Sequence, residues 1–378
     1  MSDDRAKMRW DPYVLSQGAE VDVFWRRHLS QRKRRVLLVM GRGFDVRALE
    51  TAKGLVGVGA DLRVWLLAFD NGLDDSLARA ALTEANHGQL LGLLPRDAIQ
   101  EVPVEIGGPA NSTMTSRNTQ SALRDAGDLA EFDDIVVDIS AMPRMVALTI
   151  IAVLLRRLDI LAAAEGGRSV NLHVQVAESV SADLGAAKGT LREAVTQVVG
   201  FSGQLTAQTT ENWPRIWFPV LGENQKERLD LIQTFIDPDE ICPVVPFPSR
   251  APRRGDEIVD EHRAILFDDF HVEPANILLA CEYNPFEAYK QIFVAMDRYR
   301  RALRPLQGCK AFVSPISSKL LSIAVLLACY DHRFGDVPGQ RLDVGIPYVE
   351  TAVYGDPSQP SSPDHELFSL WIRGDWEV

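Results

Sequence analysis

The sequence predicts an α/β protein with two tandem domains, each built around a mainly parallel β-sheet. Continuous apolar stretches of strand length alternate with helical patterns from residue 35 to the C-terminal region. Strands that are apolar throughout are typical of parallel sheets covered by helices on both faces. The chain of 378 residues is also longer than one hydrophobic core usually supports.

The first domain is expected over residues 35–205, behind a polar N-terminal extension over residues 1–34. Its alternation of strands and helices is that of a Rossmann-like unit. Predicted strands occupy residues 35–40, 62–69, 98–106, 134–140 and 170–179, and predicted helices occupy residues 46–59, 71–95, 120–130 and 144–163.

The second Rossmann-like domain is expected over residues 213–378, after a change of composition at residues 201–214. The same alternation restarts there and ends with a loop-like tail and a short apolar segment at residues 367–372. Predicted strands occupy residues 215–223, 240–248, 276–285, 309–315 and 344–354, and predicted helices occupy residues 224–236, 256–268, 286–303 and 317–331.

The two halves resemble diverged copies of one unit. The stretch that begins at Asp133 aligns without a gap with the stretch that begins at Gly308. In this alignment Arg144 corresponds to Lys319, each just before a long apolar helix. The alternative is that both halves reached a common strand–turn–helix geometry independently.

Composition argues against several functional classes. The formal net charge of −12 disfavours nucleic acid as the main ligand, because phosphate binding needs clustered Lys and Arg. The densest cationic cluster, residues 26–35, is interpreted as a solvated face or a partner contact, with a nucleic-acid patch as the less favoured alternative. The longest apolar run, Met145 to Leu155, is too short to span a bilayer, and the four cysteines form no metal or disulfide pattern. A cytoplasmic protein with no evident cofactor or metal is expected.

Polar side chains gather where the predicted strands end. Ligands of open parallel sheets bind outside these carboxyl ends, where helix N-termini expose N–H groups. We therefore expect a polar, anionic ligand at each sheet edge. The candidate ligand-binding residues are Arg42, Gly43, Asp45, Arg47, Asp138, Ser140 and Arg144 in the first half, and Glu282, Asn284, Ser314, Ser317, Ser318 and Lys319 in the second.

The turn before Arg144 predicts the position of this anion. Ser140 can cap the following helix, and Pro143 suits its first turn. Arg144 opposes the helix dipole at a helix start, and Lys319 repeats this placement in the second half. An anion bound at either place would make the cation favourable.

Several motifs allow a purely structural interpretation. The Gly-x-Gly at Gly41 and Gly43 forms either a tight turn or a phosphate cradle, and Asp70 either caps a helix or accepts from a ribose. Asn284 is expected to cap a helix, whereas Glu282 has no such explanation. The arginines within residues 249–257 form either an exposed turn or an anion clamp. No catalytic arrangement is evident, and Asp133 and Asp134 are interpreted as solvated caps.

The segments "DISAMPRM" and "SPISSKLL" resemble the ligand-loop motif of CARF-type domains, the Rossmann-like sensors of cyclic nucleotides in CRISPR and related antiphage systems. The tandem plan is similar to that of SAVED sensors. The chain departs from the pattern at Met142–Pro143 and Ser317–Ser318, where the family usually has paired glycines before its lysine.

Three functional hypotheses follow from these features. The favoured one, which the resemblance supports, is a regulatory module that senses a nucleotide-type anion and acts with a protein partner or as a homo-oligomer, in antiphage defence if the likeness extends to function. Arg144 and Lys319 would then contact phosphate, and Ser140, Ser317 and Ser318 would donate hydrogen bonds. The alternatives are a Rossmann-type transferase that uses a nucleotide or S-adenosylmethionine, and a non-catalytic scaffold subunit.

Overall fold

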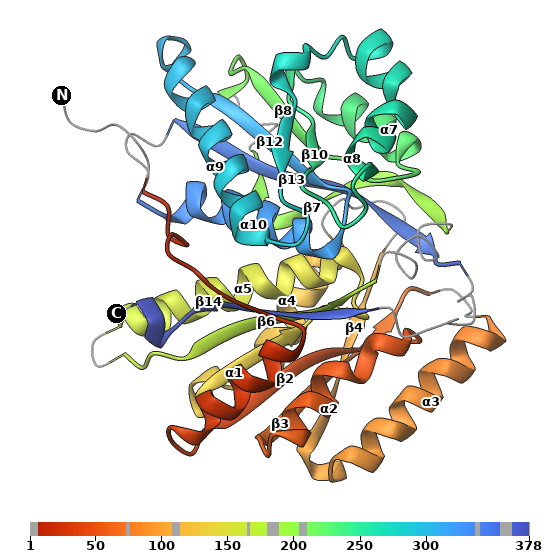
Figure 1. The fold of residues 1–378 in the computed structure, drawn as a ribbon, viewed down its shortest axis with the longest axis vertical. Helices are drawn as coiled ribbons and strands as arrows, with labels where there is room; N and C mark the ends of the chain where they lie inside the picture. Colours follow the sequence, from red (N-terminus) through yellow and green to blue (C-terminus); the bar gives the residue numbers. More distant parts are fainter. Residues whose placement is uncertain are drawn as a thin grey trace. The chain divides into compact units, whose positions relative to one another are not determined.

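The protein is an α/β structure with two mostly parallel sheets of seven strands each, as the sequence predicts (Figure 1). The computed structural model describes residues 7–72, 76–107, 114–164, 167–179, 189–203, 210–336, 341–355 and 365–377. In these parts of the chain, no helix has both the length and the apolar character that a membrane span requires.

The first sheet has the strand order β1-β14-β6-β5-β2-β3-β4. The five strands from β6 to β4 are parallel, whereas β14 runs antiparallel to β6 and β1 antiparallel to β14. In chain order the parallel strands lie 3-2-1-4-5, which is the Rossmann order. The bounds are β1 (Val14–Gln17), β2 (Arg35–Arg42), β3 (Asp61–Asp70), β4 (Ile99–Glu105), β5 (Asp134–Asp138), β6 (Asn171–Glu178) and β14 (Glu366–Arg373).

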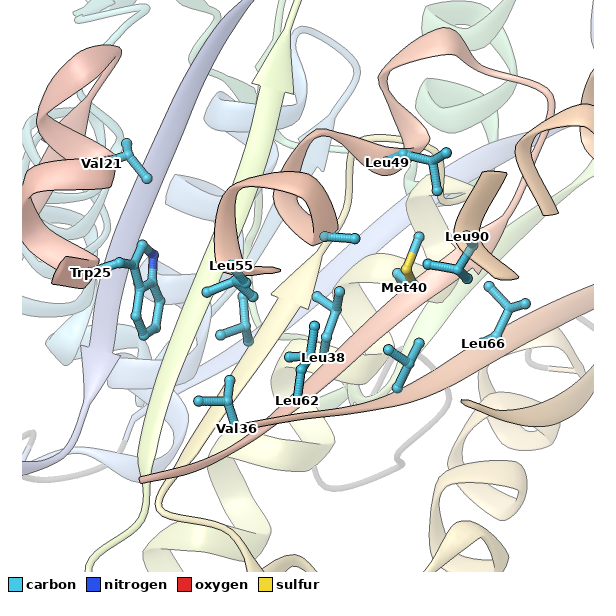
Figure 2. Close-up of a cluster of buried hydrophobic side chains, with 13 residues drawn as sticks. Val21, Trp25, Val36, Leu38, Met40, Leu49, Leu55, Leu62, Leu66 and Leu90 are labelled. Carbon is cyan, nitrogen blue, oxygen red and sulfur yellow. The ribbon is translucent and has the colours of Figure 1, made fainter. Parts of the chain in front are cut away.

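Helices cover both faces of the first sheet (Figure 1). On one face, Trp25 and Leu55 pack with Leu38 and Leu62 of the neighbouring strands β2 and β3 (Figure 2). Alternate strand residues such as Leu37 and Val39 are equally buried, so both faces of β2 lie in a core. This two-sided burial explains why the strand is apolar throughout. The bounds are α1 (Ala19–Ser30), α2 (Glu50–Gly57), α3 (Leu77–Leu93), α4 (Met114–Ala126) and α5 (Arg144–Ala163).

The second sheet has the order β11-β10-β8-β12-β13-β7, with β9 paired to β8 outside this path. Its parallel strands again lie 3-2-1-4-5 in chain order, counting β8, β10, β11, β12 and β13. The strands are β7 (Thr190–Ser202), β8 (Arg215–Val220), β9 (Glu240–Ile241), β10 (Val244–Pro246), β11 (Leu278–Ala280), β12 (Cys309–Pro315) and β13 (Leu342–Val353). The helices are α7 (Lys226–Ile236), α8 (Arg254–Glu261), α9 (Pro285–Ala302) and α10 (Lys319–Phe334).

Short helical turns connect several of these elements. They are η1 (Val46–Leu49), η2 (Arg96–Ala98), η3 (Leu129–Glu131), η5 (Ala264–Asp269), η6 (Pro274–Asn276), η7 (Arg304–Leu306) and η8 (Asp375–Glu377).

The shared strand order supports the comparison of the two halves. β5 begins at Asp134 and β12 at Cys309, which are aligned positions. α5 begins at Arg144 and α10 at Lys319, again at aligned positions. The gapless alignment therefore pairs elements that begin at equivalent residues, although the second helix was expected two residues earlier, at residue 317.

The continuous domain boundaries expected from the sequence require correction. One compact unit, here the N-terminal unit, contains the described parts of Tyr13–Pro109, Met114–Thr190 and Ala352–Val378. The other, the C-terminal unit, contains residues 7–12 and the described part of Leu191–Thr351. The reason is an exchange of strands, because β7 follows β6 in the chain but lies beside β13, and β14 follows β13 but pairs with β6.

Candidate functional site

Each sheet has one topological switch point, where its first and fourth parallel strands are neighbours. In the first sheet these strands are β2 and β5, and in the second they are β8 and β12. Chains leave the two strands toward opposite faces of such a sheet, and ligands of this fold bind in the crevice at their carboxyl ends. Seven of the predicted site residues lie at strand ends, loops or helix starts around the first switch point, and four around the second.

The glycines at the end of β2 let neighbouring segments approach closely. A Cβ on Gly43 would lie 3.1 Å from the carbonyl oxygen of Ala141, and one on Gly41 would lie 2.9 Å from the ring of Phe69. In the C-terminal unit Gly222 has the same place, since its Cβ would lie 2.9 Å from the carbonyl oxygen of Ile316. None of these three glycines has a positive φ, so close packing of the two loops explains them.

This packing predicts the effect of adding a methyl group at Gly222. Gly222→Ala should lower the free energy of unfolding by about 1–3 kcal/mol, because the backbone of the loop after β12 has to move. Gly88→Ala in α3 is the matched control, since nothing lies within 4 Å of its Cβ position and alanine favours a helix interior. Urea denaturation measures both. A Gly222→Ala protein as stable as the wild type would show that the loops do not meet as described.

The predicted phosphate cations Arg42 and Arg47 are both paired with carboxylates. Arg42 donates to Glu84 Oε1 over 2.7 Å and turns toward α3. Arg47 is buried and makes a bidentate pair with Asp45, with Nε–Oδ1 and Nη2–Oδ2 distances of 2.9 and 2.7 Å. Its Nη1 donates to the carbonyl oxygen of Ala177 in β6 over 3.0 Å. Asp45, Arg47 and β6 are thus held together at the first switch point.

Asp138 and Ser140 are buried at the end of β5 and tie it to β6. Asp138 Oδ1 accepts from the backbone N–H of Ser140 over 2.8 Å, and Ser140 Oγ accepts from the N–H of Ala177 over 2.9 Å. The prediction that Ser140 caps the next helix is wrong, because α5 begins at Arg144 with Pro143 as N-cap and without a side-chain cap. Arg144 is half-buried at the first position of this helix.

The equivalent helix start in the C-terminal unit is capped. Ser318 Oγ accepts from the N–H of Leu321 over 3.2 Å, and Lys319 is the half-buried first residue of α10. Ser314 is buried, and its Oγ accepts from Trp217 Nε1 over 2.9 Å. Ser317 is buried beside Gly222, whose Cβ position lies 3.1 Å from Ser317 Cα.

Glu282 and Asn284 hold the backbone near the end of β11. Asn284 caps α9 through its Oδ1, as predicted. Glu282 is buried and accepts from the N–H of Arg250 over 3.0 Å and from the guanidinium of Arg254. Arg254 also makes a bidentate pair with Glu223. Burial opposes ionisation of Glu223, but the hydrogen bond and charge of Arg254 outweigh it and lower its pKa.

Asp70 does not cap the helix that follows it. Its Oδ1 accepts from the N–H of Gly72 over 2.8 Å, and the cap of α3 is Ser76. The prediction that Asp70 caps the following helix is therefore wrong. Its carboxylate stabilises a turn instead.

A buried cluster of His28, Asp134 and His173 lies at the opposite end of the first sheet. Nε2 of His28 and Nε2 of His173 lie 2.7 and 3.3 Å from Asp134 Oδ1, and Asn171 Nδ2 donates to the same oxygen over 2.9 Å. Arg34 donates to Asp134 Oδ2 over 3.3 Å. The interpretation of Asp134 as a solvated cap is wrong, since the side chain is fully buried.

Arg34 supplies a positive charge to this cluster. Two imidazoles and a carboxylate converge as metal ligands can, but Arg34 already neutralises Asp134. Burial alone would raise the pKa of Asp134, yet His173 and His28 hold it well below its usual value. Burial lowers the pKa of His173, and the hydrogen bond and charge of Asp134 only partly oppose this shift. The cluster is a stabilising network at the edge away from the switch point.

Comparison with known proteins identifies no family. No family model matches the chain, and no curated protein matches it. A crystal structure described as a universal stress protein from Pseudomonas aeruginosa UCBPP-PA14 is similar over 83% of this chain and 92% of its own, with 10% identity and a TM-score of 0.21. A protein of unknown function from Pseudomonas aeruginosa PAO1 matches over 84% and 93%, with 9% identity and a TM-score of 0.21.

A third similar structure is a type III CRISPR defence DNA nuclease activated by cyclic oligoadenylate. The match covers 78% of this chain and 63% of the nuclease, with 9% identity and a TM-score of 0.42. At these identities and TM-scores, the likenesses do not extend beyond a general α/β fold.

Proposed function

We propose that the protein is a regulatory module that binds a nucleotide-type anion at the carboxyl edges of its sheets and passes this signal to a protein partner or a second copy of itself. The observation that supports it most is the repeated placement of a cation at the first position of the helix after the fourth strand. Arg144 begins α5 and Lys319 begins α10, each next to a switch point.

The electrostatics of a helix start explain why this placement favours an anion. Exposed N–H groups give a helix N-terminus a partial positive charge, so a cation there costs about 0.3–1 kcal/mol. A bound phosphate would interact favourably with both the N–H groups and the cation. α5 begins without a side-chain cap, whereas Ser318 caps α10.

A nucleotide panel tests the proposal through thermal unfolding. ATP, AMP, 3′,5′-cyclic AMP and S-adenosylmethionine are added separately to the purified chain. A nucleotide at 100 times its Kd should stabilise the protein by about 2.7 kcal/mol. Arg144→Ala or Lys319→Ala should remove most of this gain, whereas the exposed controls Arg156→Ala and Arg298→Ala should retain it.

Two outcomes would contradict the proposal. One is the absence of any shift across the nucleotides. The other is stabilisation by S-adenosylmethionine alone together with turnover, which would favour a transferase.

A further inference from the structure

The buried arginines at the two carboxyl edges differ in their counter-ions. Arg47 pairs with Asp45, and Arg254 pairs with Glu223 and Glu282. Arg228, the third residue of α7, is only 5% exposed, yet no carboxylate lies within ion-pair distance of it in the described part of the chain.

Three neutral acceptors bind the Arg228 guanidinium. Nε donates to the carbonyl oxygen of Val349 over 3.1 Å, Nη1 to Gln225 Oε1 over 2.7 Å, and Nη2 to Thr351 Oγ1 over 2.8 Å. The guanidinium also lies 5.6 Å from the centre of the Tyr348 ring. A guanidinium has five N–H donors. Three of them are used here. One N–H on Nη1 and one on Nη2 therefore have no acceptor in the described part of the chain.

Arg228 and Arg47 occupy equivalent places. Each follows the first parallel strand of its unit and donates to a carbonyl of the fifth, which is Val349 in β13 for Arg228 and Ala177 in β6 for Arg47. Each thus crosses the carboxyl end of the fourth strand, beside the switch point. The difference is that the N-terminal unit supplies a carboxylate and the C-terminal unit an amide and a hydroxyl.

A buried cation without a counter-ion is costly, and real proteins pair such groups. The remaining donors, one on each terminal nitrogen, match the paired oxygens of a phosphate or a carboxylate. Lys319 adds a second cation at the same edge of the second sheet.

We infer that Arg228 is the buried guanidinium that holds an oxyanion of the proposed ligand in the C-terminal unit, whereas Asp45 neutralises the equivalent arginine of the N-terminal unit. This inference rests on the proposed function and adds the residue that holds the oxyanion in the C-terminal unit. The ligand group is an oxyanion on a small molecule, with phosphate preferred over carboxylate because Lys319 lies at the same sheet edge as Arg228.

Thermal unfolding at constant ionic strength tests this assignment. Inorganic phosphate, AMP and acetate are titrated separately, with KCl as the balancing salt, into the wild type, Arg228→Met, Arg228→Lys and the exposed control Arg298→Ala. We expect phosphate and AMP to raise the unfolding midpoint of the wild type and of Arg298→Ala. In Arg228→Met the apparent affinity should fall at least tenfold. Arg228→Lys retains the positive charge but not the paired N–H donors of the guanidinium, so it should also bind phosphate and AMP more weakly. This second variant keeps the test valid even if Arg228→Met does not fold.

The unliganded proteins give a second readout. Arg228→Met should lower the midpoint less than Arg47→Met, because loss of Arg47 strands the Asp45 carboxylate whereas loss of Arg228 strands only neutral groups. A larger drop of the unfolding midpoint in Arg228→Met than in Arg47→Met would overturn the inference.

The outcomes separate this inference from the proposed function. A response to AMP that survives in both Arg228 variants but disappears in Arg144→Ala overturns the inference and leaves the proposed function standing. A response to acetate as strong as that to phosphate overturns the preference for a phosphate. No response of the wild type to phosphate or AMP overturns the inference, and no response to the whole nucleotide panel overturns the proposed function as well.

Discussion

Replacing Asp134 by asparagine should lower the free energy of unfolding by about 3–5 kcal/mol. The substitution preserves size but removes the buried charge partner of Arg34, whose guanidinium keeps only the half-exposed Asp375, 3.6 Å away, as a carboxylate partner. Arg34 and Asp134 are only 4% and 0% exposed at their side chains, so water cannot replace the lost interaction. Urea denaturation followed by circular dichroism measures the loss.

A matched control separates this effect from removal of any carboxylate. Asp125 and its partner Arg124 in α4 are both 71% exposed, so Asp125→Asn should change the free energy of unfolding by less than about 1 kcal/mol. Equal effects of the two substitutions would show that Asp134 is not the centre of a buried network.

The second large effect is a loss of stability in acid through His332. This imidazole in α10 is buried, stacks on the ring of Phe293 and lies 3.0 Å from the carbonyl oxygen of the same residue. Burial lowers its pKa from 6.5 to about 4. The unfolded chain therefore binds the proton more readily than the folded chain, and the folded state loses stability as the pH falls from 6.5 to 4.

This shift corresponds to about 3 kcal/mol over that interval, at 1.36 kcal/mol for each pKa unit. His332→Gln retains a donor for the Phe293 carbonyl and removes the titration, so its free energy of unfolding should depend less steeply on pH. The exposed control His271→Gln should follow the wild type. His173, whose pKa burial also lowers, adds to the slope of all three proteins and cancels in the comparison. Superimposable pH profiles of the wild type and His332→Gln would contradict the assignment.

Local sequence patterns were sufficient for the core elements of the fold. The apolar runs of β2 and β12 lie in sheets covered on both faces, and α5 and α10 begin at the aligned residues Arg144 and Lys319, although the second helix was expected from residue 317. The partner of an edge strand could not be predicted in this way. β14 has an apolar pattern that suits either sheet, and only the three-dimensional path of the chain assigns it to β6.

The site was only partly predictable for a similar reason. A sequence shows which polar residues follow a strand, but not which of them neutralise one another, as Arg47 and Asp45 do. Arg228 was missed although helical spacing offered a signal. It precedes Ile232 and Ile236 at intervals of four residues, and both are buried, so it lies on the buried stripe of α7.

Isothermal titration calorimetry with a nucleotide that stabilises the wild type tests the central claim most directly. The account predicts measurable binding to the wild type and to Arg156→Ala and Arg298→Ala. In Arg144→Ala/Lys319→Ala binding should weaken at least tenfold, since hydrogen bonds to charged groups contribute about 1.5–3 kcal/mol each. Binding of the double variant with the affinity of the wild type would contradict the claim that these two helix starts hold the anion.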